Sequence, residues 1–209
     1  MNEEVAPHND GKNEWAIWWA VETARLVREY TDGQIKTVML NPGPGAFPLE
    51  GEGLRLFKPV FEASHKYGDY IGCHPYTPAI DGLTWINKWY PLRFMQYDAY
   101  SRQEWGYYPR YLGTEAGPIG GSVEWQGDKA IPHLNAGSGW RHDTCLGGDW
   151  DLHQQVMGDT AKAIIEWNQQ HGNRFRWMFL FTVFGWGWEN FRYYTEQFND
   201  VADLAEELG

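Results

Sequence analysis

The chain has few cysteines, more acidic than basic residues and no long apolar run, and each of these excludes a class of protein. Only Cys73 and Cys145 are present, so the chain is not a small disulfide scaffold, and we expect both to be free thiols. The formal net charge of −11 argues against nucleic acid or an anionic membrane as a partner. No apolar stretch reaches the ~20 residues that a membrane-spanning helix needs. No signal-peptide pattern is recognisable, and the sequence leaves secreted and cytoplasmic locations open.

Motifs for several kinds of chemistry are also missing. No glycine-rich loop with a following Lys precedes a helix, which excludes a P-loop phosphate site, and no Gly-x-Ser-x-Gly elbow marks a serine hydrolase. Histidines and aspartates do gather in the second half of the chain, but their spacing fits no zinc pattern; they are His133, His142, Asp143, Asp149 and His153. We therefore expect neither a metal nor another cofactor.

Aromatic residues are abundant, and helical and strand patterns alternate along the chain. There are 13 Trp among 209 residues, which suits either an aromatic-rich core or flat surfaces on which sugar rings stack. The alternation favours βα units and a parallel sheet in an α/β fold. Strands are expected at 35–40, 70–74, 110–114 and 175–184. Helices are expected at 14–31, 54–67, parts of 83–105, 151–170 and 195–208.

The spacing of apolar residues predicts the buried face of each helix. The first helix is expected to begin with Asn13 as N-cap and to end at Gly33. Its large apolar residues are expected to form one buried stripe; they are Trp15, Trp18, Trp19, Leu26, Val27 and Tyr30. The other inward-facing residues are expected to be Phe57, Val60 and Phe61 in the second helix, and Leu152, Val156, Ile164 and Ile165 in the helix at 151–170. The segment 118–149, dense in Gly and His, is expected to be a long loop.

Two acidic motifs carry a resemblance to a known family. Residues 111–117 have the sequence Tyr-Leu-Gly-Thr-Glu-Ala-Gly, so that an apolar strand delivers Glu115 to a loop of small residues, and Asn2-Glu3 supplies a second carboxylate. Glycoside hydrolysis typically uses two carboxyl groups that face one bond. Thr114-Glu115 resembles the nucleophile motif that ends the seventh strand of clan A glycoside hydrolase barrels, and Asn2-Glu3 resembles the acid/base motif that ends the fourth.

This resemblance implies a partial or truncated (β/α)8 TIM barrel. Residues 1–209 would form a single barrel region that runs from a stub of strand four to strand eight and lacks the first three βα units. A complete barrel usually needs about 250 residues, with about 200 the low end, and the chain has 209. Two sheet edges would be open, so we expect a missing N-terminal half or another chain to complete the barrel.

Further site residues follow from the ends of the expected strands, where barrel enzymes place their active sites. His74 and Tyr76 resemble the sixth-strand segment of clan A, in which a His or Tyr approaches the nucleophile and holds its carboxylate ionised. Trp186 and Trp188 follow the last expected strand, where the clan has a Trp beneath the sugar. The remaining candidates are Asn2, which by resemblance would bind the sugar 2-hydroxyl, and Asn41, a polar residue after the strand at 35–40.

The resemblance implies a retaining glycoside hydrolase that degrades a polysaccharide or other β-linked glycan. Glu115 would attack the anomeric carbon, and Glu3 would protonate the leaving oxygen and later activate water. Asn13-Glu14 is a rival to Asn2-Glu3, but Glu14 falls in the first turn of a helix, where Glu is favoured by the helix dipole. The alternative is a non-catalytic carbohydrate-binding or structural protein on a degenerate barrel. A metal-dependent barrel hydrolase would need several His and Asp at strand ends, and only His74 qualifies.

Overall fold

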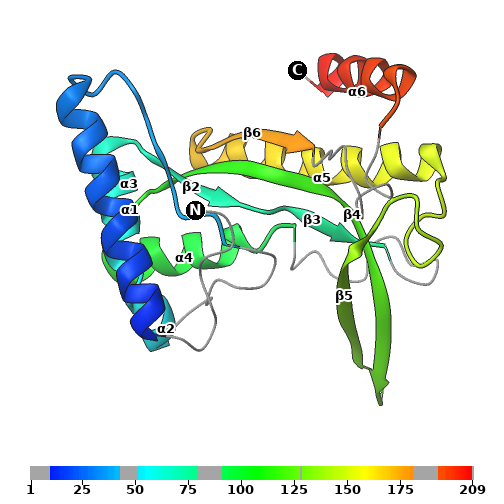
Figure 1. Ribbon diagram of the computed structural model, residues 1–209, viewed down its shortest axis with the longest axis horizontal. Helices are drawn as coiled ribbons and strands as arrows, with labels where there is room; N and C mark the ends of the chain where they lie inside the picture. Colours follow the sequence, from blue (N-terminus) through cyan, green and yellow to red (C-terminus); the bar gives the residue numbers. More distant parts are fainter. Residues whose placement is uncertain (1–9, 43–50, 80–90, 128, 181–192, 209) are drawn as a thin grey trace. The chain divides into compact units, whose positions relative to one another are not determined.

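The chain is an α/β protein made of two compact units. The computed structural model describes residues 10–42, 51–79, 91–127, 129–180 and 193–208 (Figure 1). Unit 1 comprises Met1–Pro75, Leu92–Glu115 and His171–Phe179, and unit 2 comprises Tyr76–Pro91, Ala116–Gln170 and Leu180–Gly209.

Unit 1 contains a parallel sheet and the helices that accompany it. Its strands are β1 (Val38–Met39), β2 (Tyr70–Cys73), the first part of β4 (Arg110–Gln126) and β6 (Phe175–Leu180). Strand β2 pairs in parallel with β1 on one side and with β4 on the other, and β6 also pairs with β4. The helices are α1 (Asp10–Tyr30), α2 (Gly51–Arg55), α3 (Lys58–Tyr67) and α4 (Phe94–Trp105).

Unit 2 is built from a hairpin and two helices. Strand β3 (Tyr76–Pro78) pairs in parallel with the second part of β4, which also pairs antiparallel with β5 (Lys129–Gly139). The helices are α5 (Trp150–His171) and α6 (Thr195–Leu208). The predicted loop at 118–149 is therefore wrong. The sequence Ser-Val-Glu-Trp-Gln at 122–126 alternates polar and apolar residues, as a strand does, and Gly127 takes the positive φ of 64° at the turn.

Helices α3 and α4 each end at a glycine, a signal that the sequence-based predictions did not use. Gly68 and Gly106 adopt the left-handed conformation directly after the last helical residue, with φ of 74° and 68°. Glycine is favoured there because it has no Cβ to clash with the following carbonyl. The predicted helix at 54–67 is two helices, α2 and α3, but its inward residues Phe57, Val60 and Phe61 are fully buried, as expected.

A buried carboxylate fastens α4 to the strands of unit 1. Asp98 is fully buried and accepts hydrogen bonds from both terminal nitrogens of Arg174, at 2.6 and 3.0 Å. It also accepts bonds from Nε of Arg102 (2.8 Å) and from the Tyr111 hydroxyl (3.1 Å). Both carboxylate oxygens are thus satisfied by two cations and a phenol, which is what a buried charge needs.

Helix α1 shows two departures from the prediction. Asn13 is not an N-cap, because it lies inside the helix and is buried. The aromatic stripe faces outward: Trp15, Trp18 and Trp19 are 54%, 59% and 46% exposed. The buried face consists of three alanines, Ala16, Ala20 and Ala24, together with Ile17. The prediction that these aromatic residues share one side of the helix is correct. The prediction that this side is buried is wrong, because the helix has two apolar faces and the one with smaller side chains is buried.

Most other predicted elements are confirmed, with changes at their ends. Strand β2 and helices α5 and α6 lie within a residue or so of the expected positions, and Val156 and Ile164 are buried on α5, whereas Ile165 and Leu152 are half-buried. The strand expected at 35–40 is reduced to Val38–Met39, since Leu40 turns out of the strand with φ of 51°.

Candidate functional site

The carboxyl ends of three parallel strands of unit 1 meet at one edge of the sheet. Val38 is paired with Tyr70, and Tyr70 with Arg110, so β1, β2 and β4 run side by side in the same direction. Polar side chains follow each strand end: Asn41 after β1, His74 after β2, and Glu115 beyond the paired part of β4 in this unit. Three of the predicted site residues are therefore brought to a common edge.

His74 and Glu115 form the closest pair of titratable groups at this edge. Nδ1 of His74 lies 3.6 Å from Oε2 of Glu115. The imidazole is fully buried, whereas the Glu115 side chain keeps 18% of its surface exposed. The two atoms are close together but too far apart for a hydrogen bond. The exposed part of the Glu115 side chain can be reached by a small molecule. That Glu115 is a nucleophile and His74 its supporting neighbour stays a prediction.

Asn41 is held in place from β4 and β2. The Thr114 hydroxyl lies between two acceptors, and it donates to Oδ1 of Asn41 or to the carbonyl oxygen of Cys73, which is 3.1 Å away. This contact fixes which way the Asn41 carboxamide is turned. Because Thr114 directly precedes Glu115, the orientation of Asn41 is coupled to the strand end that carries the carboxylate.

Gly72 makes room for this arrangement. A Cβ on Gly72 would lie 2.5 Å from Oδ1 of Asn41 and 2.5 Å from the carbonyl oxygen of Leu40. The Gly72 amide donates a 3.1 Å hydrogen bond to that same carbonyl. Only glycine therefore allows the end of β1 to approach β2 so closely. The sequence analysis missed Gly72, although a glycine inside a short apolar strand is a signal of close backbone approach.

The backbone at Leu40 is strained. Its φ of 51° lies in the left-handed region, which a leucine rarely adopts, and its side chain is buried. Such a conformation costs about 1–3 kcal/mol and persists where the surrounding structure fixes it, often at functional sites. The strained residue lies immediately before Asn41. No sequence pattern predicted the left-handed conformation of Leu40.

The other predicted site residues are placed elsewhere or are not described. Asn2, Glu3, Trp186 and Trp188 lie outside the described residues, so the proposed catalytic pair is described only on its Glu115 side. Tyr76 is the first residue of β3, belongs to unit 2 and is 5% exposed.

The two cysteines are free and buried, as expected for cysteine. Burial raises the pKa of the Cys73 thiol to about 12, against a smaller opposing effect of the hydrogen bond with Tyr97. Burial likewise raises the pKa of Cys145 to about 12. Thiols with such pKa values stay protonated near neutral pH and are poor nucleophiles.

The histidines of unit 2 have separate structural roles. His153 is buried among Trp140, Trp150 and Tyr193, and its Nε2 shares a 2.7 Å hydrogen bond with the Tyr193 hydroxyl. Burial lowers the pKa of His153 to about 3, so the ring is neutral. His133 pairs with Glu124 at 3.1 Å, and His142 contacts Thr144. Across the described residues, no three His, Cys, Asp or Glu side chains are grouped closely enough to hold a metal ion.

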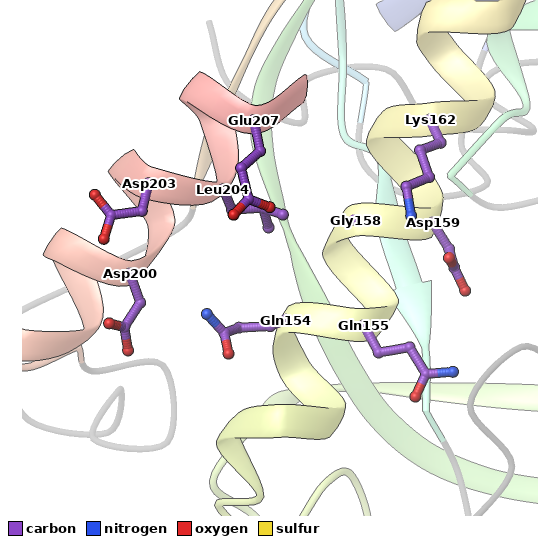
Figure 2. Close-up of a pocket in the computed structure, with 9 residues that line it drawn as sticks. All are labelled: Gln154, Gln155, Gly158, Asp159, Lys162, Asp200, Asp203, Leu204 and Glu207. Atoms are coloured by element: carbon purple, nitrogen blue, oxygen red, sulfur yellow. The ribbon is translucent and has the colours of Figure 1, made fainter. Parts of the chain in front are cut away.

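A groove of about 410 Å³ lies between α5 and α6 in unit 2 (Figure 2). Its lining is mostly acidic and polar; it consists of Gln154, Gln155, Gly158, Asp159, Lys162, Asp200, Asp203, Leu204 and Glu207. Figure 2 shows that Asp203 points away from α5 and that Asp159 points away from α6. The carboxylates therefore do not converge on a common point, and none of the predicted site residues is among them.

Comparison with known proteins identified no relative of the chain. No helix in the described part of the chain is both long enough and apolar enough to cross a membrane. The chain matches no family model, no curated protein and no solved structure.

Proposed function

We propose that the chain is part of a retaining glycoside hydrolase of clan A type, with the strands of unit 1 belonging to a partial (β/α)8 barrel. The observation that carries the proposal is the common carboxyl edge of β1, β2 and β4, where Asn41, His74 and Glu115 follow successive parallel strands. Within the described residues β1 is paired on one side only. Further strands would be needed to close a barrel.

In the proposed mechanism Glu115 is the nucleophile. Its carboxylate attacks the anomeric carbon of a β-linked glycan while the glycosidic bond breaks, giving a covalent glycosyl–enzyme ester. Glu3 donates a proton to the leaving oxygen. In the second step Glu3 removes a proton from water, the water oxygen attacks the same carbon, and Glu115 leaves as a carboxylate. Two inversions give net retention.

The other residues at the edge bind and orient. His74, with Nδ1 3.6 Å from Oε2 of Glu115, holds the carboxylate in the direction of attack. Asn41, which contacts the Thr114 hydroxyl, would bind a sugar hydroxyl. By the same resemblance, Trp186 and Trp188 would support the sugar ring, and Asn2 would contact its 2-hydroxyl.

The test compares two Glu-to-Gln variants on a panel of aryl β-glycosides. Glu115→Gln removes the negative charge but keeps the shape, so release of the aryl alcohol should fall by at least about 10³-fold, as expected when a catalytic group is removed. Glu104→Gln changes an exposed residue of α4 and should match the parent. Turnover by Glu115→Gln close to that of the parent would refute the assignment. Sugar binding by calorimetry without turnover in the parent would favour the non-catalytic alternative.

A further inference from the structure

The side-chain carboxamide of Asn41 has a donor end and an acceptor end, and its neighbours engage the acceptor end. The oxygen Oδ1 contacts the hydroxyl of Thr114. In a carboxamide the oxygen only accepts hydrogen bonds, whereas the nitrogen Nδ2 carries two hydrogens and only donates them. The end of the carboxamide that meets a bound molecule therefore decides whether that molecule must accept or donate a hydrogen bond.

The oxygen end of Asn41 lies against two strands. Gly72 of β2 pairs with Leu112 of β4, and Thr114 is two residues further along β4. Because side chains alternate along a strand, Thr114 is on the same side of the sheet as Leu112 and Gly72. Oδ1 of Asn41 is 2.5 Å from the position that a Cβ on Gly72 would take. The oxygen is thus packed on the bare backbone of β2 as well as on the Thr114 hydroxyl.

The Thr114 hydroxyl holds the oxygen end by donating to it. A hydroxyl has one hydrogen to donate, and Oδ1 of Asn41 is nearer to it than the carbonyl oxygen of Cys73, which is 3.1 Å away. We therefore assign the hydrogen to the bond with Asn41. The reverse arrangement, in which Nδ2 donates to the hydroxyl and Oδ1 is turned away from it, makes the opposite prediction for a bound molecule.

The arrangement is maintained by two costly features of the backbone. Leu40 has a φ of 51°, and β2 must have glycine at position 72 beneath Oδ1 of Asn41. Strain of this kind is concentrated at functional sites, where it helps to fix the geometry of a side chain. Asn41, Thr114 and Glu115 are all half-buried, so each keeps part of its surface accessible. These features favour a role for Asn41 toward a bound molecule.

We propose that Nδ2 of Asn41 donates a hydrogen bond to an oxygen of the bound sugar, and that Thr114 is the positioning residue that sets this polarity. This contact deepens the proposed function and rests on it for the identity of the ligand, a glycan. Because Nδ2 has two hydrogens, one can donate to the sugar even where the other donates within the protein. The sugar hydroxyl at this position acts as an acceptor.

The polarity is tested by calorimetry with aryl β-thioglycosides of several sugars, in which sulfur replaces the glycosidic oxygen so that binding is measured without turnover. Each sugar hydroxyl is replaced in turn by hydrogen or by fluorine, which accepts a hydrogen bond but cannot donate one. At one position hydrogen should weaken binding by about 3–10-fold, as expected for one neutral hydrogen bond, and fluorine should restore part of the loss.

Two variants of Asn41 show whether this residue makes the contact. In Asn41→Ala the fluoro and deoxy compounds should bind equally at that position, because the donor is gone. Asn41→Asp has a similar shape but only acceptor atoms, so fluorine should there bind more weakly than hydrogen. A preference for fluorine that persists in Asn41→Ala would assign the donor to another residue and would overturn the proposal.

The role of Thr114 is tested by two variants and a matched control. Thr114→Val removes the hydroxyl but keeps the shape, so the carboxamide can turn and the preference for fluorine over hydrogen should be lost. Thr114→Ser keeps the hydroxyl and should keep the preference. In Thr37→Val a hydroxyl that contacts Asp69 at 3.0 Å, before β1, is removed, and the preference should be unchanged. A Thr114→Val variant with lower Tm and an intact preference would show a purely structural role and refute the assignment.

The outcomes for Asn41 and for catalysis can be told apart. Fluoro compounds that bind no better than deoxy compounds at every position would overturn the proposed polarity, while the hydrolase would still stand on turnover and on Glu115→Gln. The predicted preference in a parent that binds thioglycosides but cleaves no aryl glycoside would support the polarity and refute the hydrolase. A parent that binds none of the thioglycosides would overturn the proposed contact.

Discussion

Replacing Gly72 with Ala tests the close approach of β1 and β2 that positions Asn41. The new Cβ would lie 2.5 Å from two oxygens, Oδ1 of Asn41 and the carbonyl oxygen of Leu40. One of these is backbone, so rotating a side chain does not relieve the clash. The strand end must move, and the 3.1 Å bond from the Gly72 amide to Leu40 must lengthen.

The expected loss of stability follows from these two effects. Overpacking costs about 1–3 kcal/mol, and the weakened hydrogen bond costs about 1 kcal/mol, so the free energy of unfolding should fall by about 2–4 kcal/mol. For a domain of this length, 1 kcal/mol corresponds to roughly 2–4 °C in Tm. The decrease in Tm should therefore be about 5–15 °C, measured by circular dichroism on heating.

Gly117→Ala is the matched control. Gly117 is also in a strand, has no neighbour within 4 Å of the added Cβ, and has no positive φ. Its replacement should leave Tm unchanged or raise it slightly, because alanine restricts the unfolded chain. A second variant, Asn41→Ala/Gly72→Ala, removes one of the two clashes and should recover only part of the loss. If Gly72→Ala melts within about 1 °C of the parent, where a decrease of at least about 5 °C is expected, β1 and β2 do not approach each other as closely as described.

Three further predictions concern buried ionisable groups. Asp98→Ala leaves Arg174 without its carboxylate and should lower the free energy of unfolding in urea by about 3–5 kcal/mol; a loss under about 1 kcal/mol would contradict the buried network. Cys73 and Cys145, with pKa values raised by burial to about 12, should not react with a thiol reagent at pH 8 in the folded protein, whereas both should react in denaturant; rapid reaction of either native thiol would argue against its burial. Burial lowers the pKa of His153 from 6.5 to about 3, so its full contribution to stability should be present above about pH 6.5 and should be lost progressively as the pH falls to about 3. His153→Gln should flatten the Tm–pH curve between these two pH values. An unchanged slope in the variant would refute this role of His153.

Local sequence patterns predicted most elements because the spacing of apolar residues differs between helices and strands. Helix α3 carries both inward apolar residues and Gly68 at its end, and strand β2 is a short apolar run. The hairpin β4–β5 was missed because its glycine and histidine content resembles that of a loop, and the length of a strand is settled by its partner. The outward face of α1 was missed for a related reason. Which side of a helix is buried depends on the space left by the elements that it packs against, and here that space fits alanines.

The candidate site was predicted in the same uneven way. Asn41, His74 and Glu115 could be named because polar residues after apolar strands are visible in the sequence. The features that arrange them could not: the left-handed Leu40, the contact of Thr114 with Asn41, and the space above Gly72 all depend on the register between strands. Register is a tertiary property, and in short parallel strands no turn fixes it locally.

The most direct test of the proposed function is to trap the glycosyl–enzyme ester. The protein is incubated with activated 2-deoxy-2-fluoro-β-glycosides of several sugars, which form the ester but hydrolyse slowly, and the labelled peptide is identified by mass spectrometry. The account predicts a single sugar label on Glu115, with no label on the Glu115→Gln variant and normal labelling of Glu104→Gln. A label on a different carboxylate, or turnover of the glycoside with no ester on Glu115, would contradict it.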